Sequence, residues 1–162
     1  MVKEGLFVEL SEIFKESNII ADVASKDKEG LFTELVDFLA DRENIKNKEA
    51  VIDAVWERER MLNTIIAPAI ALPHAGLRRQ KETLGVFAVS HSGVDYGDSE
   101  GGLVHIIMLL IDDRSASKKH LRTLREAATL ISSPNFFTKV MKCRNASEVY
   151  AVIREVEEMQ RV

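Results

Sequence analysis

The residues best suited to chemistry in this chain are its four histidines, at positions 74, 91, 105 and 120. None of them belongs to an HExxH pair or to another close spacing typical of metal ligands. The single cysteine, Cys143, excludes an intrachain disulfide and a multi-cysteine zinc site, and we interpret it as structural. The sequence also lacks GxxxxGK[ST] and GxGxxG. We therefore expect no metal and no cofactor, and the histidines are the candidate nucleophiles.

His74 has the sequence context of a side chain that is presented from a loop. It follows Pro73, whose ring restricts the backbone, and it precedes Ala75 and the permissive Gly76. Neutral imidazole is a nucleophile near pH 7, and phosphorylation of a ring nitrogen gives a labile bond. His74 is therefore suited to the relay of phosphoryl groups. The alternative is a loop histidine that only bonds to backbone.

Two other histidines are interpreted as structural. His105 lies in the apolar run from Val104 to Leu110, which favours a core histidine bonded to backbone over one that points into an active cleft. His91 follows a predicted strand, and we expect it at a surface turn.

The elements that must position these residues begin with two amphipathic helices. Apolar residues recur every three or four positions between Lys28 and Arg42, with Ser25 and Asp27 as candidate N-caps. A second helix is predicted from the N-cap Asn47 through about Leu62. Its last turns carry the charge run 57–60, which by itself is typical of a solvated face.

The middle of the chain is predicted to be rich in strands. Ile19 to Ala24 indicates a short strand or an extended entry to the helix, and Thr83 to Ser90 indicates a strand. Leu103 to Ile111 is continuously apolar, as in a buried central strand. Thr64 to Leu72 contains Pro68, which favours a loop leading into an edge or short strand.

Helical periodicity returns after Ser117. The predicted apolar face carries Leu121 and Leu124 and extends to Ile131. Ser133 and Pro134 are assigned as N-cap and N1 of a further helix. Asn145 is predicted to cap a last helix over 146–160. Helices at both ends of a strand-rich centre predict an α/β fold in which a mixed sheet is sandwiched by helices. We expect one domain over residues 1–162.

Composition excludes several classes of function. The 22 basic and 26 acidic residues are spread along the chain and give a net charge of −4, so we expect no nucleic-acid partner. The longest apolar runs are far shorter than the roughly 20 residues of a membrane span, and the N-terminus lacks a signal-peptide core. The sequence thus predicts a cytoplasmic protein that is not embedded in a membrane.

Two motifs resemble those of the fructose/mannitol-type enzyme IIA (EIIA type-2) domains of the bacterial sugar phosphotransferase system. The segment from Arg58 and Glu59 through Thr64 to Pro73 and His74 is similar to the family signature that ends at its phosphorylated histidine. The segment His120, Leu121, Arg122, Thr123, Leu124 resembles the HLxxL element that supplies a second active-site histidine. The resemblance extends over nearly the whole chain and is greatest to the nitrogen-regulatory branch.

The resemblance implies both a fold and a set of site residues. The fold would be that of the fructose/mannitol-type IIA domains. His74 would accept phosphate, His120 would lie beside it, and Arg58 would place a positive charge near the transferred group, with Thr64 as a further phosphate-binding residue. Glu59 would be structural and would orient Arg58 by an ion pair. Convergence of His74 and His120 in space is required by this assignment.

The resemblance also implies partners and leaves alternatives open. A histidine phosphocarrier of the HPr type would donate the phosphoryl group, and a IIB domain or a regulatory target would be the acceptor. The absence of fused IIB or IIC sequence favours regulation over sugar relay. A third alternative is a degenerate binding module, because Ile65, Ala67 and Ala69 stand where the family usually has glycines and Pro68 lies among them.

Overall fold

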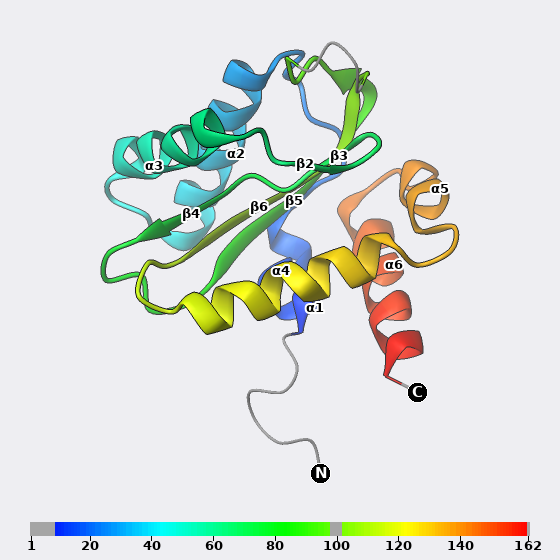
Figure 1. Ribbon diagram of the computed structural model, residues 1–162. Helices are drawn as coiled ribbons and strands as arrows, with labels where there is room; N and C mark the ends of the chain where they lie inside the picture. The colour runs from blue at the N-terminus through cyan, green and yellow to red at the C-terminus, as the bar shows by residue number, and fades with distance from the viewer. Residues whose placement is uncertain (1–8, 98–101, 162) are drawn as a thin grey trace.

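A mixed β-sheet with helices on both faces forms the centre of the fold, as Figure 1 shows for the computed structural model. The structure describes residues 9–97 and 102–161, and within them the sheet has six strands in the order β1-β5-β6-β3-β2, with β4 also paired to β6. The strands are β1 (Ile19–Ile20), β2 (Ile65–Ala67), β3 (Ile70–Ala71), β4 (His74–Leu77), β5 (Leu84–Val94) and β6 (Val104–Asp113). The predicted α/β class is confirmed.

β6 is the central strand, as its apolar sequence predicts. One edge of β6 pairs antiparallel with β5, and the other pairs parallel with β3 and, further along, with β4. Its side chains alternate between two buried clusters, with Ile106, Met108 and Leu110 in one and Ile107, Leu109 and Ile111 in the other. Because both faces are covered, the run from Ile106 to Ile111 is continuously apolar.

One face of the sheet is covered by α2 (Lys28–Glu43) and α3 (Lys48–Met61). Both helices begin where the sequence predicts. The side chain of Asp27 accepts a hydrogen bond from the amide of Gly30, and that of Asn47 accepts one from Ala50, so each satisfies an otherwise unpaired first-turn amide.

The opposite face is covered by α1 (Leu10–Ile13), α4 (Ser117–Ile131), α5 (Phe136–Met141) and α6 (Ala146–Gln160), and a 3-10 helix spans Glu16–Asn18. Asn145 caps α6 as predicted, because its side chain accepts from the amide of Glu148.

Two predictions for this half of the chain are wrong in detail. The buried stripe of α4 consists of Thr123, Ala127 and Leu130, whereas Leu121 is exposed, because a regular apolar spacing does not show which side the sheet covers. Ser133 and Pro134 do not begin α5: they lie in a turn that ends at Asn135, whose positive φ precedes the first helical residue.

The segment before His74 is more regular than a loop. β2 and β3 form an antiparallel hairpin whose two-residue turn is Pro68 and Ala69, and β2 lies at the edge of the sheet. Proline is compatible with this position because a residue in the turn does not have to donate a backbone hydrogen bond to a neighbouring strand. The edge-strand prediction is confirmed, and between Ile65 and Ala71 only the turn lies outside the strands.

β5 is longer than predicted and continues to Val94, so His91 lies on a strand and not at a turn. The prediction of one domain over 1–162 includes residues 1–8, 98–101 and 162, which lie outside the described residues, and it stays a prediction.

Candidate active site

A cavity of about 340 Å³ opens where α3, β4, the end of β6 and the start of α4 meet. Arg58 and Met61 line it from α3, His74 from β4, Asp112 from β6 and His120 from α4. The structure therefore brings together three of the residues that the sequence singles out, although they come from different elements.

His74 is the first residue of β4, where parallel pairing with Leu110 of β6 fixes its backbone. Its Nδ1 lies 2.8 Å from the carbonyl oxygen of Leu72. A carbonyl oxygen only accepts hydrogen bonds, so Nδ1 carries the proton and donates it. The lone pair of the neutral ring is then on Nε2, which is the nitrogen available as a nucleophile.

The surroundings of His74 favour its neutral form. Burial lowers the pKa of the ring below its ordinary value of 6.5, and the charges of His120 and Arg58 lower it further, against the opposing effect of the bond to Leu72. At neutral pH the ring is therefore present as the nucleophilic base.

His120 lies beside His74, with ring centroids 5.0 Å apart and ring planes inclined by 44°. The predicted convergence of the two histidines is confirmed. The Nδ1 of His120 is hydrogen-bonded to the carboxylate of Asp112 at the end of β6.

Asp112 is a site residue that sequence reasoning missed. Its second carboxylate oxygen accepts a hydrogen bond from the hydroxyl of Thr83, just before β5. Burial by itself would raise the pKa of Asp112, but the bonds from His120 and Thr83 outweigh it and lower that pKa. The signal in the sequence is a carboxylate directly after the apolar run that ends at Ile111.

Arg58 projects from the last turns of α3 and donates from Nη1 to the carbonyl oxygen of Leu62 at 2.9 Å. This bond holds the side chain at the cavity wall, and its charge acts on His74 as described above. A guanidinium in this position can bind the oxygens of a phosphoryl group with several donors.

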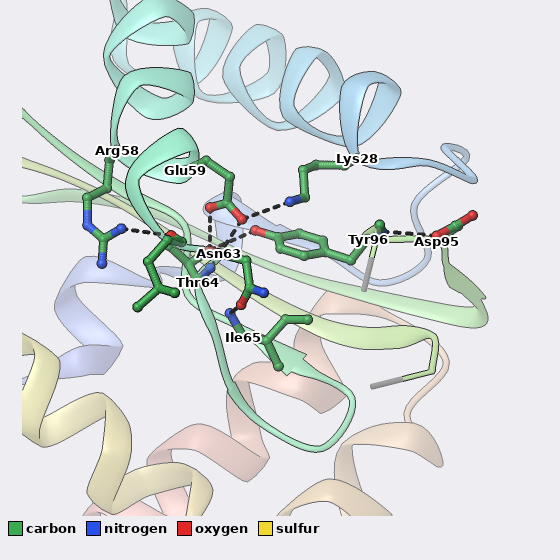
Figure 2. Close-up of polar contacts among 10 residues, drawn as sticks. Lys28, Arg58, Glu59, Asn63, Thr64, Ile65, Asp95 and Tyr96 are labelled. Carbon is green, nitrogen blue, oxygen red and sulfur yellow. Dashed lines mark hydrogen bonds and ion pairs between the residues drawn. The ribbon is translucent and has the colours of Figure 1, made fainter. Parts of the chain in front are cut away.

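Glu59 does not orient Arg58, contrary to the sequence-based prediction. Figure 2 shows the two side chains leaving α3 in different directions, with Glu59 between Lys28 and Thr64. The Glu59 carboxylate is 3.0 Å from the Lys28 ammonium and accepts bonds from the amide and hydroxyl of Thr64. Glu59 is nearly fully buried, so it takes the partners that satisfy it inside the fold.

Thr64 belongs to this buried network and does not line the cavity. Its hydroxyl donates to Glu59 at 2.7 Å and is 2.7 Å from the hydroxyl of Tyr96 (Figure 2). Burial raises the pKa of Tyr96, so its hydroxyl stays protonated and donates to Thr64. The structure thus does not bring Thr64 to the position of a phosphate ligand, because both functions of its hydroxyl are used by neighbours.

The remaining candidates lie outside the cavity. The Nδ1 of His105 is 2.7 Å from the carbonyl oxygen of Ser90, which confirms the backbone bond predicted for it. His91 is half-exposed at the other end of β5, beside Asp22. Cys143 is buried, with Sγ 3.3 Å from the carbonyl oxygen of Lys139. In the part of the chain that the structure describes, no three His, Cys, Asp or Glu side chains converge to hold a metal ion.

The turn before His74 contains a residue, Ala69, in a backbone conformation that glycine prefers. Ala69 has φ +68°, in the left-handed region where a side chain is strained. Ala69 therefore adopts a conformation that glycine would adopt without a side-chain penalty.

Comparison with known proteins shows which proteins this chain is similar to. The family model described as "Phosphoenolpyruvate-dependent sugar phosphotransferase system, EIIA 2" matches residues 12–156. The nitrogen regulatory protein of Bradyrhizobium diazoefficiens is 27% identical over 108 residues, which are 67% of this chain and 71% of that protein. The fructose-specific EIIABC component of Bacillus subtilis is 24% identical over 148 residues, which are 91% of this chain and 23% of that protein.

A solved structure shows the same fold. The nitrogen regulatory protein IIA-Ntr of Neisseria meningitidis superposes with a TM-score of 0.81 at 26% sequence identity, covering 89% of this chain and 98% of that one. Over residues 9–97 and 102–161, no helix is both long and apolar enough to cross a membrane.

Proposed function

Because the chain belongs to the phosphoenolpyruvate-dependent sugar phosphotransferase system EIIA 2 family, we propose that it is a phosphocarrier that accepts a phosphoryl group on Nε2 of His74. The observation that carries this proposal is the bond from Nδ1 to Leu72, which leaves Nε2 as the nucleophile in a cavity shared with His120 and Arg58. We place the protein in the cytoplasm, where its phosphoryl donor would act.

The transfer is a displacement at phosphorus. The lone pair of His74 Nε2 attacks the phosphorus of a phosphohistidine on an HPr-type carrier, and the new P–N bond forms as the donor's P–N bond breaks. The electron pair of the broken bond returns to the donor's ring nitrogen. Nδ1 keeps its proton and its bond to Leu72, which stabilises the positive charge that the phosphorylated ring acquires.

Arg58 and His120 supply the electrostatic part of this step. Charge is spread over the phosphoryl oxygens during transfer, so fixed donors around them lower the barrier more than covalent chemistry does. Arg58 approaches from α3 and His120 from α4, on different walls of the cavity. The two would hold the phosphoryl group between them.

Regulation is the use of the phosphoryl group that the relatives favour. The B. diazoefficiens and N. meningitidis relatives are both named as nitrogen regulatory proteins. In this mode, contacts with a target protein depend on the charge that phosphorylation adds at His74. The B. subtilis relative supports the second candidate, sugar relay, because its name joins the A component to B and C components.

The proposal is tested by incubation with phosphoenolpyruvate, enzyme I and an HPr-type carrier. Intact-protein mass spectrometry should show one added phosphate, acid-labile and alkali-stable, on the natural protein and none on His74→Ala. His91→Ala is the control, because this half-exposed histidine lies outside the cavity, and it should label like the natural protein.

The alternatives give other outcomes in the same assay. Full labelling of His74→Ala would remove His74 as the acceptor, and a natural protein that never labels would favour a degenerate binding module. Loss of label to a purified fructose-type IIB domain would favour sugar relay over regulation.

A further inference from the structure

We propose that Asp112 is a positioning residue for phosphoryl acceptance: its carboxylate fixes a proton on Nδ1 of His120 and so turns Nε2 of that ring towards the group that His74 carries. This inference rests on the proposed function of His74. Asp112 belongs to neither of the motifs on which the family resemblance depends.

Asp112 is a buried carboxylate that is hydrogen-bonded on both of its oxygens. Its side chain is 3% exposed, and its two oxygens take different partners, the Nδ1 of His120 and the hydroxyl of Thr83. Thr83 stands next to the start of β5, whose residue Leu84 pairs with Ile111 of β6, so the sheet itself places the hydroxyl beside the carboxylate. With both oxygens held, the carboxylate has a fixed direction, and so has the imidazole bonded to it.

The charge of Asp112 decides which nitrogen of His120 carries a proton. The bonds from His120 and Thr83 lower the pKa of Asp112 despite its burial, so the carboxylate is ionised at neutral pH. An ionised carboxylate only accepts hydrogen bonds, and Nδ1 of His120 must therefore be the donor. The neutral form protonated on Nε2 alone is excluded while Asp112 is charged.

The position of the proton on His120 determines how this ring can bind the phosphoryl group. With Nδ1 committed to Asp112, Nε2 can donate to a phosphoryl oxygen only when the His120 ring carries both protons and a positive charge. An anionic phosphoryl group at Nε2 provides the acceptor for that second donor. The pair would thus meet the phosphoryl group with a charge-assisted donor opposite Arg58.

A second Asp–His pair in the chain provides a matched control. The carboxylate of Asp22 lies 3.3 Å from Nδ1 of His91 and accepts a bond from the His91 amide. This pair is far more exposed than the first, and neither residue lines the cavity. Asp22→Asn therefore removes the same charge from the same kind of pair without touching the site.

The first measurement is the protonation pattern of His120 by long-range ¹H–¹⁵N NMR of the full, unphosphorylated chain. We expect the Nδ1 of His120 to have the shift of a protonated nitrogen in the natural protein and to lose it in Asp112→Asn. Asp22→Asn should change the signals of His91 and leave those of His120 in place. His120 signals that do not respond to Asp112→Asn would overturn the inference.

The second measurement is the rate of labelling by rapid quench. Asp112→Asn should slow labelling about tenfold, because a charge-assisted donor becomes a neutral one. The same substitution should have no further effect in a His120→Ala background, whereas a merely structural role would slow both proteins alike. Thr83→Val, which keeps the carboxylate and removes one of its bonds, should give a smaller loss and serves if Asp112→Asn does not fold.

The two measurements separate this inference from the proposed function. If the natural protein never accepts phosphate, the proposed function fails, while the NMR signals still decide whether Asp112 sets the state of His120. If it labels normally and Asp112→Asn labels equally fast, phosphoryl acceptance stands and the role of Asp112 is refuted.

Discussion

The neutral imidazole of His74 gives the proposed phosphoryl acceptance a defined acid limit. Protonation of Nε2 removes the nucleophilic lone pair, and burial lowers the pKa of this ring below 6.5. We therefore predict that the labelling rate persists as pH falls to 6.5 and declines only through the lowered pKa. Rates across this range, compared with the NMR titration of the His74 ring, test this directly. A decline centred at or above 6.5 would contradict it.

The same shift has a consequence for stability. In the unfolded chain His74 takes up a proton near its ordinary pKa, whereas the folded protein resists it. The stabilising contribution is present in full above the unfolded value and is lost as pH falls through the folded-state pKa. Urea unfolding should show that, as pH falls from the unfolded-state pKa to the folded-state pKa of His74, the His74→Gln protein loses less stability than the natural protein.

Arg58 is predicted to matter for transfer and not for folding. Its side chain donates to the carbonyl of Leu62, at the end of a helix that is anchored elsewhere. Arg58→Ala should slow labelling at least about tenfold with little change in melting temperature, because a guanidinium bonds to phosphate chiefly when phosphate is present. Arg60→Ala, an exposed change in the same turn, is the control and should label normally. If Arg58→Ala and Arg60→Ala slow labelling equally, the loss of positive charge on α3 would be responsible, and not the position of Arg58.

At the scale of elements, the end of α3 is held by the buried Glu59 network. The carboxylate of Glu59 joins α3 to Lys28 of α2 and to Thr64 before β2, so one residue orders the helix end from which Arg58 projects (Figure 2). Loss of its charge would leave the partly buried Lys28 ammonium unpaired. The network is therefore more important for the fold than an exposed pair would be.

We predict that Glu59→Gln destabilises the fold by about 3 kcal/mol. Chemical denaturation measures this, and Glu43→Gln is the comparison, because its ion pair with Lys15 is far more exposed and should be worth less than about 1 kcal/mol. A cost for Glu59→Gln as small as that for Glu43→Gln would show that the buried ion pair contributes little.

The turn between β2 and β3 carries strain that a single substitution should relieve. Ala69 holds a positive φ, whereas Ala67 lies in β2, so the two positions respond to glycine in opposite ways. Ala69→Gly should stabilise the protein by about 0.5–1 kcal/mol, since glycine removes the left-handed penalty at some cost in chain entropy. Ala67→Gly should destabilise it by a similar amount. Denaturation curves decide the sign, and stabilisation by both would mean that the strain is not located at Ala69.

Local signals predicted the elements better than they predicted the site. Asp27, Asn47 and Asn145 were identified as helix caps because a cap is decided by the first few residues of its own helix. The hairpin turn was harder to predict because Pro68 indicates a break, and nothing local shows that β3 pairs with β6.

For the site, too, contacts between residues that are distant in the sequence could not be predicted from local motifs. His74 and His120 were identified from motifs, but the role of Asp112 depends on Thr83 and His120, which only the sheet and α4 bring to it. Thr64 was assigned to phosphate because its motif ends at His74, while its hydroxyl is used inside the fold by Glu59 and Tyr96. Tyr96 lies far along the chain from Thr64, so no spacing rule links them.

For the whole molecule, the cavity is lined by α3 and α4. These two helices lie on opposite faces of the sheet (Figure 1). Exposed apolar side chains border this place. Met61 lines the cavity itself and is 79% exposed, and Leu121, next to His120, is 61% exposed. A carrier that delivers a phosphoryl group to His74 must cover this rim, and burying apolar side chains there would stabilise the encounter.

We therefore predict that Met61→Glu and Leu121→Glu raise the concentration of phosphorylated carrier needed for half-maximal labelling about tenfold and leave the maximal rate nearly unchanged. The reason is that Met61 lines the cavity with His74 and Leu121 follows His120 on α4, so both would act on docking, while a glutamate would stay charged and solvated at the rim. Met159→Glu is the matched control, because Met159 is 62% exposed at the end of α6 and does not line the cavity. Labelling rates over a range of carrier concentrations separate the two parameters. A fall in maximal rate alone would place these residues in the transfer step, and an equal effect of Met159→Glu would attribute the loss to added negative charge on the whole molecule.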